Sequence, residues 1–237
     1  MSNDQNDQIN ILDVGNYIVE KTIEYPCFLK AKNKKDREDP RHGLFIFDNY
    51  ILSKIIYYIY VTSLLQDKPI FSNEHLFASM YGTIFPKVIE NYSMPDGYYV
   101  VKGSTNGDSN KLTPENKKMI DSIIKFISIR MKNQKEFIDI NRQQRAYFKT
   151  RYPIKEMKEK TKDKLEFTEK EFDDMNNPMK KIITDELIKE CFKKEKNIFS
   201  IDEDCRYKHI PKYFNSRTAY YFPKGLKLVS NFKFTEI

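Results

Sequence analysis

The 237-residue sequence contains no tryptophan and only three cysteines, which are Cys27, Cys191 and Cys205. The cysteines are odd in number and widely spaced, with no Cys-x-x-Cys pair, so they predict neither a disulfide framework nor a zinc knuckle. Isoleucine, lysine, asparagine and tyrosine are used heavily instead, a bias typical of AT-rich coding sequence. This bias raises the lysine and asparagine content for reasons unrelated to function.

The sequence also lacks the motifs of common catalytic and cofactor sites. It has no Gly-x-Gly-x-x-Gly, no Gly-Lys-Ser/Thr phosphate loop and no Gly-x-Ser-x-Gly nucleophile elbow. Its three histidines, His42, His75 and His209, are far apart, and none has a carboxylate or cysteine at ligand spacing. The acidic run at 202–204 favours a solvated turn, because adjacent carboxylates do not converge on one ion. We therefore expect no catalytic residue, no metal site and no cofactor.

A membrane-spanning run is missing too. Residues 50–65 are nearly all apolar, but as a helix they span about 24 Å, short of the roughly 30 Å of a bilayer core, and they include Lys54. They predict a buried central helix. The first eight residues are acidic and amide-rich, unlike a signal peptide. We expect a cytoplasmic protein that makes no membrane contact.

The composition favours a mainly helical globular fold. With 40% hydrophobic and 32% charged residues, the chain is expected to bury roughly three-quarters of its unfolded surface. We predict a disordered N-terminus at 1–8, a helical domain at 9–192 and a basic extension at 193–237 packed on that core. Residues 30–43 contain no apolar side chain larger than Ala31 and predict a mobile charged loop.

Hydrophobic periodicity and capping residues predict the helices. The expected starts are Asn10 with Asp13 at the third position, Asp48 or Asn49, Pro86, Thr113-Pro114-Glu115, and Thr184. A polar helix is expected to continue from the fourth of these through Phe137, Ile140 and Phe148. Residues 70–85 predict a short helical stretch mixed with turns. At the C-terminal end, alternation from Leu226 to Phe234 predicts one strand of a β-hairpin, with residues 219–222 as its partner.

The net charge of +7 is concentrated in the last 32 residues, where seven lysines and arginines stand against one acid, Glu236. Basic groups interleaved with aromatic rings are typical of nucleic-acid surfaces. The strand-like alternation favours another interpretation, in which the aromatic side packs on the helices and the lysines face water. Docking onto an acidic protein is a third. The candidate contact residues are Arg206, Lys208, Lys212, Arg217, Tyr220 and Tyr221.

Four segments of the first 92 residues resemble the Panacea domain, a SocA-like, phage-associated family of antitoxins. Residues 11–18 are similar to its Asp-Val-Ala-x-Tyr-Ile helix, and 52–58 to its Lys-Leu-Gln-Lys-Leu-Leu-Tyr-Tyr. Residues 68–71 and 78–86 resemble its Pro-Leu-Phe and Ala-Trp-x-Tyr-Gly-Pro-Val-x-Pro. Ser79 replaces the family's Trp and Thr83 its Pro. Ile140, Asn141 and Tyr147 echo its later Thr-His-x-x-x-x-Trp segment.

The resemblance implies an antitoxin that neutralises a cognate toxin by direct protein contact, in a family found on phages and mobile elements. The motif positions that match, and that the resemblance offers as partner-binding residues, are Lys54, Tyr57, Tyr58, Tyr81, Gly82 and Pro86. The residues themselves favour core packing for the tyrosine pair. A lysine in an apolar helix is costly to bury, so Lys54 is expected to reach the helix edge or meet a carboxylate. Nucleic-acid binding by the basic extension is the second hypothesis.

Overall fold

The structure is a computed structural model that describes residues 8–25, 27–29, 45–79, 82–92, 103–131, 134–151, 181–192, 198, 226–228 and 234–236. The chain divides into two compact units, the first drawn from 1–74 and 85–134 and the second from 75–84 and 135–237. This division falls within the domain predicted at 9–192. The predicted charged loop at 30–43, residues 1–7 and most of the basic extension lie outside the described residues. The fold is mainly helical, as predicted.

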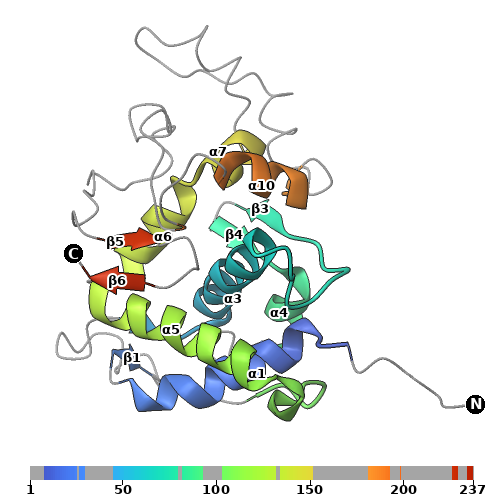
Figure 1. The fold of residues 1–237 in the computed structure, drawn as a ribbon, viewed down its shortest axis with the longest axis vertical. Coiled ribbons are helices and arrows are strands. Elements are labelled where there is room, and N and C mark those ends of the chain that lie inside the picture. Colours follow the sequence, from blue (N-terminus) through green and yellow to red (C-terminus); the bar gives the residue numbers. More distant parts are fainter. Residues whose placement is uncertain are drawn as a thin grey trace, which may run out of the picture. The chain divides into compact units, whose positions relative to one another are not determined.

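The first unit is built on helices (Figure 1). Helix α3 is its centre and lies against α1, α4 and α5. Strands β1 and β2 form a short parallel pair with Phe28 opposite Phe45. The elements are α1 (Ile11–Lys21), η1 (Thr22–Glu24), β1 (Phe28–Leu29), β2 (Phe45–Ile46), α3 (Asn49–Leu65), α4 (Pro86–Asn91), η3 (Ser109–Lys111) and α5 (Pro114–Arg130).

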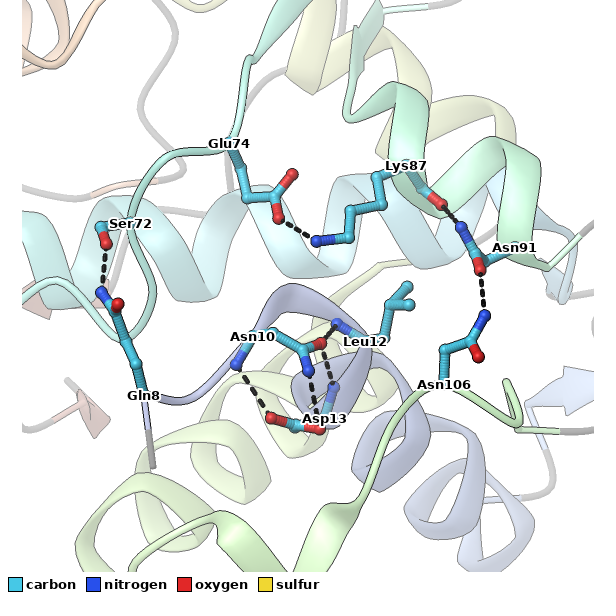
Figure 2. Close-up of polar contacts among 9 residues, drawn as sticks. All are labelled: Gln8, Asn10, Leu12, Asp13, Ser72, Glu74, Lys87, Asn91 and Asn106. Atoms are coloured by element: carbon cyan, nitrogen blue, oxygen red, sulfur yellow. Dashed lines mark hydrogen bonds and ion pairs between the residues drawn. The ribbon is translucent and has the colours of Figure 1, made fainter. Parts of the chain in front are cut away.

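Side-chain caps start the helices where the sequence predicts them. At α1, Asn10 accepts hydrogen bonds from the N–H groups of Leu12 at 2.7 Å and Asp13 at 3.2 Å (Figure 2). The Asp13 carboxylate accepts in turn from the backbone N–H of Asn10 at 2.8 Å, which completes a capping box. Asp48 caps α3, and Thr113 caps α5 with Pro114 in its first turn.

Helix α3 is buried on all sides, which confirms the prediction of a central helix. Every residue from Ile51 to Leu64 is buried. On one side the Tyr60 ring stacks on Phe71 with centroids 4.8 Å apart, and both rings meet Phe85 edge-on at 5.9 and 5.6 Å. Each buried side chain of this size contributes roughly 2 kcal/mol of transfer free energy, so α3 organises the unit.

The described residues of the second unit form three helices and two antiparallel strand pairs. Its described elements are β3 (Phe77–Ser79), β4 (Gly82–Ile84), α6 (Gln134–Arg142), α7 (Arg145–Arg151), α10 (Asp185–Phe192), β5 (Leu226–Leu228) and β6 (Phe234–Glu236). Strands β3 and β4 are antiparallel, with Ala78 opposite Thr83, and a bridge joins Phe77 to Ile182. The short helix expected within 70–85 is therefore wrong. The described residues there are bends and irregular backbone up to residue 76, and then strands whose pairing partners the local pattern does not reveal.

The continuous polar helix expected through Phe148 is also wrong. Helix α5 ends at Arg130, where Met131 adopts an extended backbone with φ −90° and ψ 124°. A turn at residues 143–144 then separates α6 from α7. The apolar positions were correctly placed, because Phe137, Ile140 and Phe148 are all buried. Apolar spacing thus predicted burial here but not the breaks between helices.

The C-terminal strands pair differently from the expected hairpin. Strand β5 is antiparallel to β6, with Leu226 opposite Glu236 and Leu228 opposite Phe234. Leu226 and Phe234 thus lie on two strands, whereas their alternation predicted one. The predicted partner at 219–222 lies outside the described residues. Alternation has the same period in one long strand as in two short ones, so it does not locate the turn.

Among the helices of the described ranges, none is long and apolar enough to cross a membrane.

Candidate functional site

The motif positions on α3 are packed in the core. Lys54, Tyr57 and Tyr58 are 0% exposed, and the two tyrosine rings meet edge-on with centroids 5.2 Å apart. This confirms packing for the tyrosines. Of the two outcomes expected for Lys54, this burial excludes the solvated helix edge, and contact with a carboxylate stays a prediction. The Lys54 Nζ lies 3.5 Å from the carbonyl oxygen of Tyr50 and 5.8 Å from the centroid of the Tyr50 ring.

The motif positions after β3 determine the local backbone conformation. Gly82 has φ 99°, a conformation that favours glycine, and its carbonyl accepts a hydrogen bond from the Ser79 hydroxyl at 2.9 Å. Pro86 occupies the first turn of α4, where a missing N–H is tolerated. Tyr81 lies outside the described residues. The matching positions therefore shape a turn and a helix start.

Ser79 and Thr83, two of the departures from the family motif, have polar partners in the second unit. The Thr83 N–H donates to Asn141 Oδ1 at 2.8 Å, and Asn141 Nδ2 donates to the Thr83 hydroxyl at 2.8 Å. A proline at position 83 would have no N–H to offer. The Tyr147 hydroxyl donates to the Ser79 carbonyl at 2.7 Å. Burial raises the pKa of Tyr147 to about 12, so it remains a neutral donor. Asn141 and Tyr147, which echo the family's later segment, both hold this hairpin.

Asn16 fastens α1 to the loop at 103–108. Its Nδ2 donates to the carbonyl oxygens of Ser104 at 2.9 Å and Gly107 at 2.7 Å. Its Oδ1 accepts from the Ser104 N–H at 2.6 Å and the Tyr92 hydroxyl at 2.7 Å. One side chain thus satisfies three backbone groups of a loop 88 residues away in sequence. Sequence analysis missed this contact, because a Gly/Ser/Asn-rich segment indicates a loop without naming its partner.

Close packing around the same tyrosine explains a glycine of α1. A Cβ at Gly15 would lie 2.4 Å from the Tyr92 hydroxyl oxygen. The Tyr92 hydroxyl also lies 3.0 Å from the Leu12 carbonyl. Burial raises the pKa of Tyr92 far above its usual value, which keeps the phenol protonated as a donor. Part of the segment that resembles the family's first helix therefore packs the unit internally.

A row of polar contacts runs along α4 (Figure 2). Glu74 forms a 2.6 Å ion pair with Lys87. The Lys87 carbonyl accepts from the Asn91 side chain at 2.9 Å, and Asn106 Nδ2 donates to Asn91 Oδ1 at 3.2 Å. Nearer the N-terminus, the Gln8 side chain donates to the Ser72 hydroxyl. These contacts tie surface segments together.

A groove of about 460 Å³ lies along α5 beside the chain that follows η1. We call it the α5 groove. Apolar groups and lysines line it together, a combination that sequence analysis missed because its residues come from segments about 90 positions apart. The lining residues are Tyr25, Leu112, Pro114, Lys117, Lys118, Asp121, Ser122 and Lys125.

The Asp121 carboxylate, which lines the α5 groove, accepts hydrogen bonds from a tyrosine of α1. The Tyr17 hydroxyl donates to the two carboxylate oxygens of Asp121 at 3.0 and 3.2 Å, and Lys117 Nζ stands 5.5 Å from the Tyr17 ring centroid. Burial, and then the hydrogen bond to Asp121, raise the pKa of Tyr17 to about 12. Lys118 and Lys125 are exposed and form no ion pair with any residue that the structure describes.

Two large apolar side chains stand in solvent near the α5 groove. Ile23 is 70% exposed and Ile129 is 59% exposed. Ile23 precedes the groove residue Tyr25 by two positions, and Ile129 follows Lys125 by one helical turn. With Lys118 and Ser122, Lys125 and Ile129 form a stripe at spacings of four and three on the outer face of α5. This surface combines positive charge with unburied apolar area.

Within the described ranges, the other candidate residues do not come together in a catalytic or metal-binding site. No three His, Cys, Asp or Glu side chains in the described ranges are placed to hold a metal ion. Burial raises the pKa of the half-buried Cys27 thiol, which disfavours the reactive thiolate. The candidate contacts of the basic extension lie outside the described residues. They are Arg206, Lys208, Lys212, Arg217, Tyr220 and Tyr221.

Comparison with known proteins finds no family model, no curated protein and no solved structure that matches this chain.

Proposed function

We propose that this chain is an antitoxin-like protein-binding module that neutralises a cognate toxin by direct contact in the cytoplasm and carries no catalytic residue. The observation that carries the proposal is the exposure of Ile23 and Ile129 near the α5 groove. Exposed apolar side chains beside polar ones are typical of protein-binding surfaces. The segments that resemble the Panacea motif support the same function, because that family acts through protein contact.

The burial of the motif positions directs the proposal to a different surface. Lys54, Tyr57 and Tyr58 have no exposed area, so a partner that docks on the folded unit does not reach them. Their part in binding is indirect, through the packing of α3. The contact surface is instead the outer face of α5 with the chain around Ile23.

Co-expression with the neighbouring open reading frame of the operon tests the proposal. A stoichiometric complex, together with a neighbour that stops growth when expressed alone, is the expected result. The variant Ile23→Asp/Ile129→Asp is expected to lose the complex and the protection while remaining folded, since both side chains are exposed. Gln66→Asp/Asn73→Asp, at two exposed positions outside α5, changes the net charge by the same amount and is the matched control. Absence of any complex with the wild-type chain would contradict the proposal.

Nucleic-acid binding is the alternative function, favoured by the basic and aromatic residues after 205. It predicts co-purifying nucleic acid that salt removes steeply, because phosphate contacts release counterions. Replacing Arg206, Lys208, Lys212 and Arg217 with glutamine in the full chain should abolish that binding. The same variant should keep its protein partner if the antitoxin proposal is right, so the two functions are separable in one preparation.

A further inference from the structure

We infer that the α5 groove binds an acidic amphipathic helix of the partner protein, with carboxylates seven residues apart and an apolar side chain between them. This inference rests on the proposed function and specifies the chemistry of its contact. Its basis is the arrangement of Lys118, Ser122 and Lys125 on one stripe of α5 beside an apolar floor.

The charge of the groove selects an acidic occupant. Three lysines line it against one aspartate, and Tyr17 already donates its hydroxyl to that carboxylate. Lys118 and Lys125 are exposed and make no ion pair with the residues that the structure describes. Two unneutralised ammonium groups on one face attract carboxylates and raise the association rate of an acidic partner.

The spacing of these lysines indicates that the bound segment of the partner is a helix. Seven helical residues rise about 10.5 Å, so Lys118 and Lys125 match carboxylates at positions i and i+7 of a helix lying alongside. Ser122 lies between them, and its small side chain lets another helix approach closely. Its hydroxyl donates to the Lys118 carbonyl at 2.9 Å, so it requires no partner group.

The floor of the α5 groove and the C-terminal end of the α5 stripe provide apolar surface for contact with the partner. Tyr25, Leu112 and Pro114 line the groove, and its volume of about 460 Å³ is at the lower end of ligand pockets, enough for a few side chains. Ile129 continues the stripe one turn beyond Lys125. An apolar residue at the middle of the partner helix would enter the groove, where burial of its surface adds to the charge attraction.

The same features disfavour nucleic acid as the occupant. The Asp121 carboxylate lies among the lysines, and a phosphate backbone would be repelled by it. The exposed isoleucine offers no phosphate contact and lacks the flat face on which bases stack. An acidic helix instead has an apolar side chain for the isoleucine and carboxylates for the lysines.

A synthetic helical peptide tests the inference without knowledge of the partner. The probe has Glu at positions i and i+7 with Leu at i+3 and i+4, and amide NMR shifts of the full-length chain are the readout. Shifts confined to Tyr25 and residues 112–129 are expected. Lys118→Glu and Lys125→Glu should each weaken peptide binding at least tenfold, while Lys68→Glu, with the same charge change on another exposed lysine, should change it less than twofold.

Three results would overturn the inference. They are an absence of shifts along α5, equal effects of all three lysine variants, or stronger shifts from a single-stranded oligonucleotide at the same residues. The antitoxin proposal and the groove inference are tested by separate results. Peptide binding without any toxin partner removes the antitoxin proposal alone, whereas a toxin complex that tolerates both groove variants removes the groove inference alone.

Discussion

Replacing Asn16 with alanine is expected to detach the loop at 103–108 from α1 and to destabilise the first unit. The amide side chain makes four hydrogen bonds of 2.6 to 2.9 Å. The alanine substitution removes all four hydrogen bonds at once and adds no side-chain volume. Because three of the four partner groups belong to the loop backbone, the loss is concentrated in one segment.

The magnitude follows from which groups lose a partner. The Tyr92 hydroxyl retains the Leu12 carbonyl at 3.0 Å, so its loss is small. The Ser104 carbonyl likewise keeps the Gly107 N–H at 3.2 Å. The Ser104 N–H and the Gly107 carbonyl lose their Asn16 partner, at about 1 kcal/mol each. We therefore expect the free energy of unfolding to fall by about 2 kcal/mol.

Urea unfolding followed by circular dichroism measures this change, and hydrogen exchange of the Ser104 amide locates it. Asn116→Ala is the matched control, because Asn116 is partly exposed on α5, where alanine is well tolerated. The control should change stability by less than about 0.5 kcal/mol. If Asn16→Ala matched the control and left Ser104 exchange unchanged, the argument that this side chain anchors the loop would be wrong.

Three other predictions follow from single contacts. Gly15→Ala should destabilise the chain by about 1 to 3 kcal/mol through its contact with Tyr92, and less so in a Tyr92→Leu background, as measured by a double-mutant cycle in urea. Thr83→Val should cost about 1 to 2 kcal/mol by leaving the buried Asn141 amide short of a partner, and much less when Asn141 is already Ala. The pKa of Tyr17 is raised from 10.0 to about 12, so its stabilising effect is complete below pH 10 and is lost as the pH rises to about 12. Tyr17→Phe should therefore reduce the fall in unfolding free energy over that range.

Each of these has a result that contradicts it. Additive effects of Gly15→Ala and Tyr92→Leu would mean that the alanine meets something other than the tyrosine. An equal cost of Thr83→Val with and without Asn141 would remove their coupling. An unchanged alkaline dependence in Tyr17→Phe would show that this phenol titrates alike in the folded and unfolded chain.

Local chemistry was sufficient to predict where most helices begin. Asn10 and Thr113 were identified, and Asp48 was one of two candidates with Asn49, because a cap acts on N–H groups only two or three residues ahead. The buried centre at α3 was equally readable, since a helix with apolar residues on several faces requires cover on several sides. Burial of the tyrosine pair followed from the same reasoning.

Long-range pairing was decided only by the tertiary structure. The hairpin of β3 and β4 depends on Asn141 and Tyr147, which follow it by 58 and 68 residues. The fold likewise decided that Lys54 does not reach the helix edge, since the residue is 0% exposed. The sequence shows that a charge in an apolar helix is costly, but not what lies against it.

The α5 groove, too, was only partly predictable from the sequence. The lysines of α5 were visible as ordinary polar positions of an amphipathic helix, and composition alone attributed them to codon bias. Only the fold brings Tyr25 and Lys125 into the lining of one groove and gives Asp121 the Tyr17 hydroxyl as its partner. Helix starts depend on neighbours in the chain, so the sequence determined them, whereas a groove depends on surfaces from distant segments that meet only when the chain is folded.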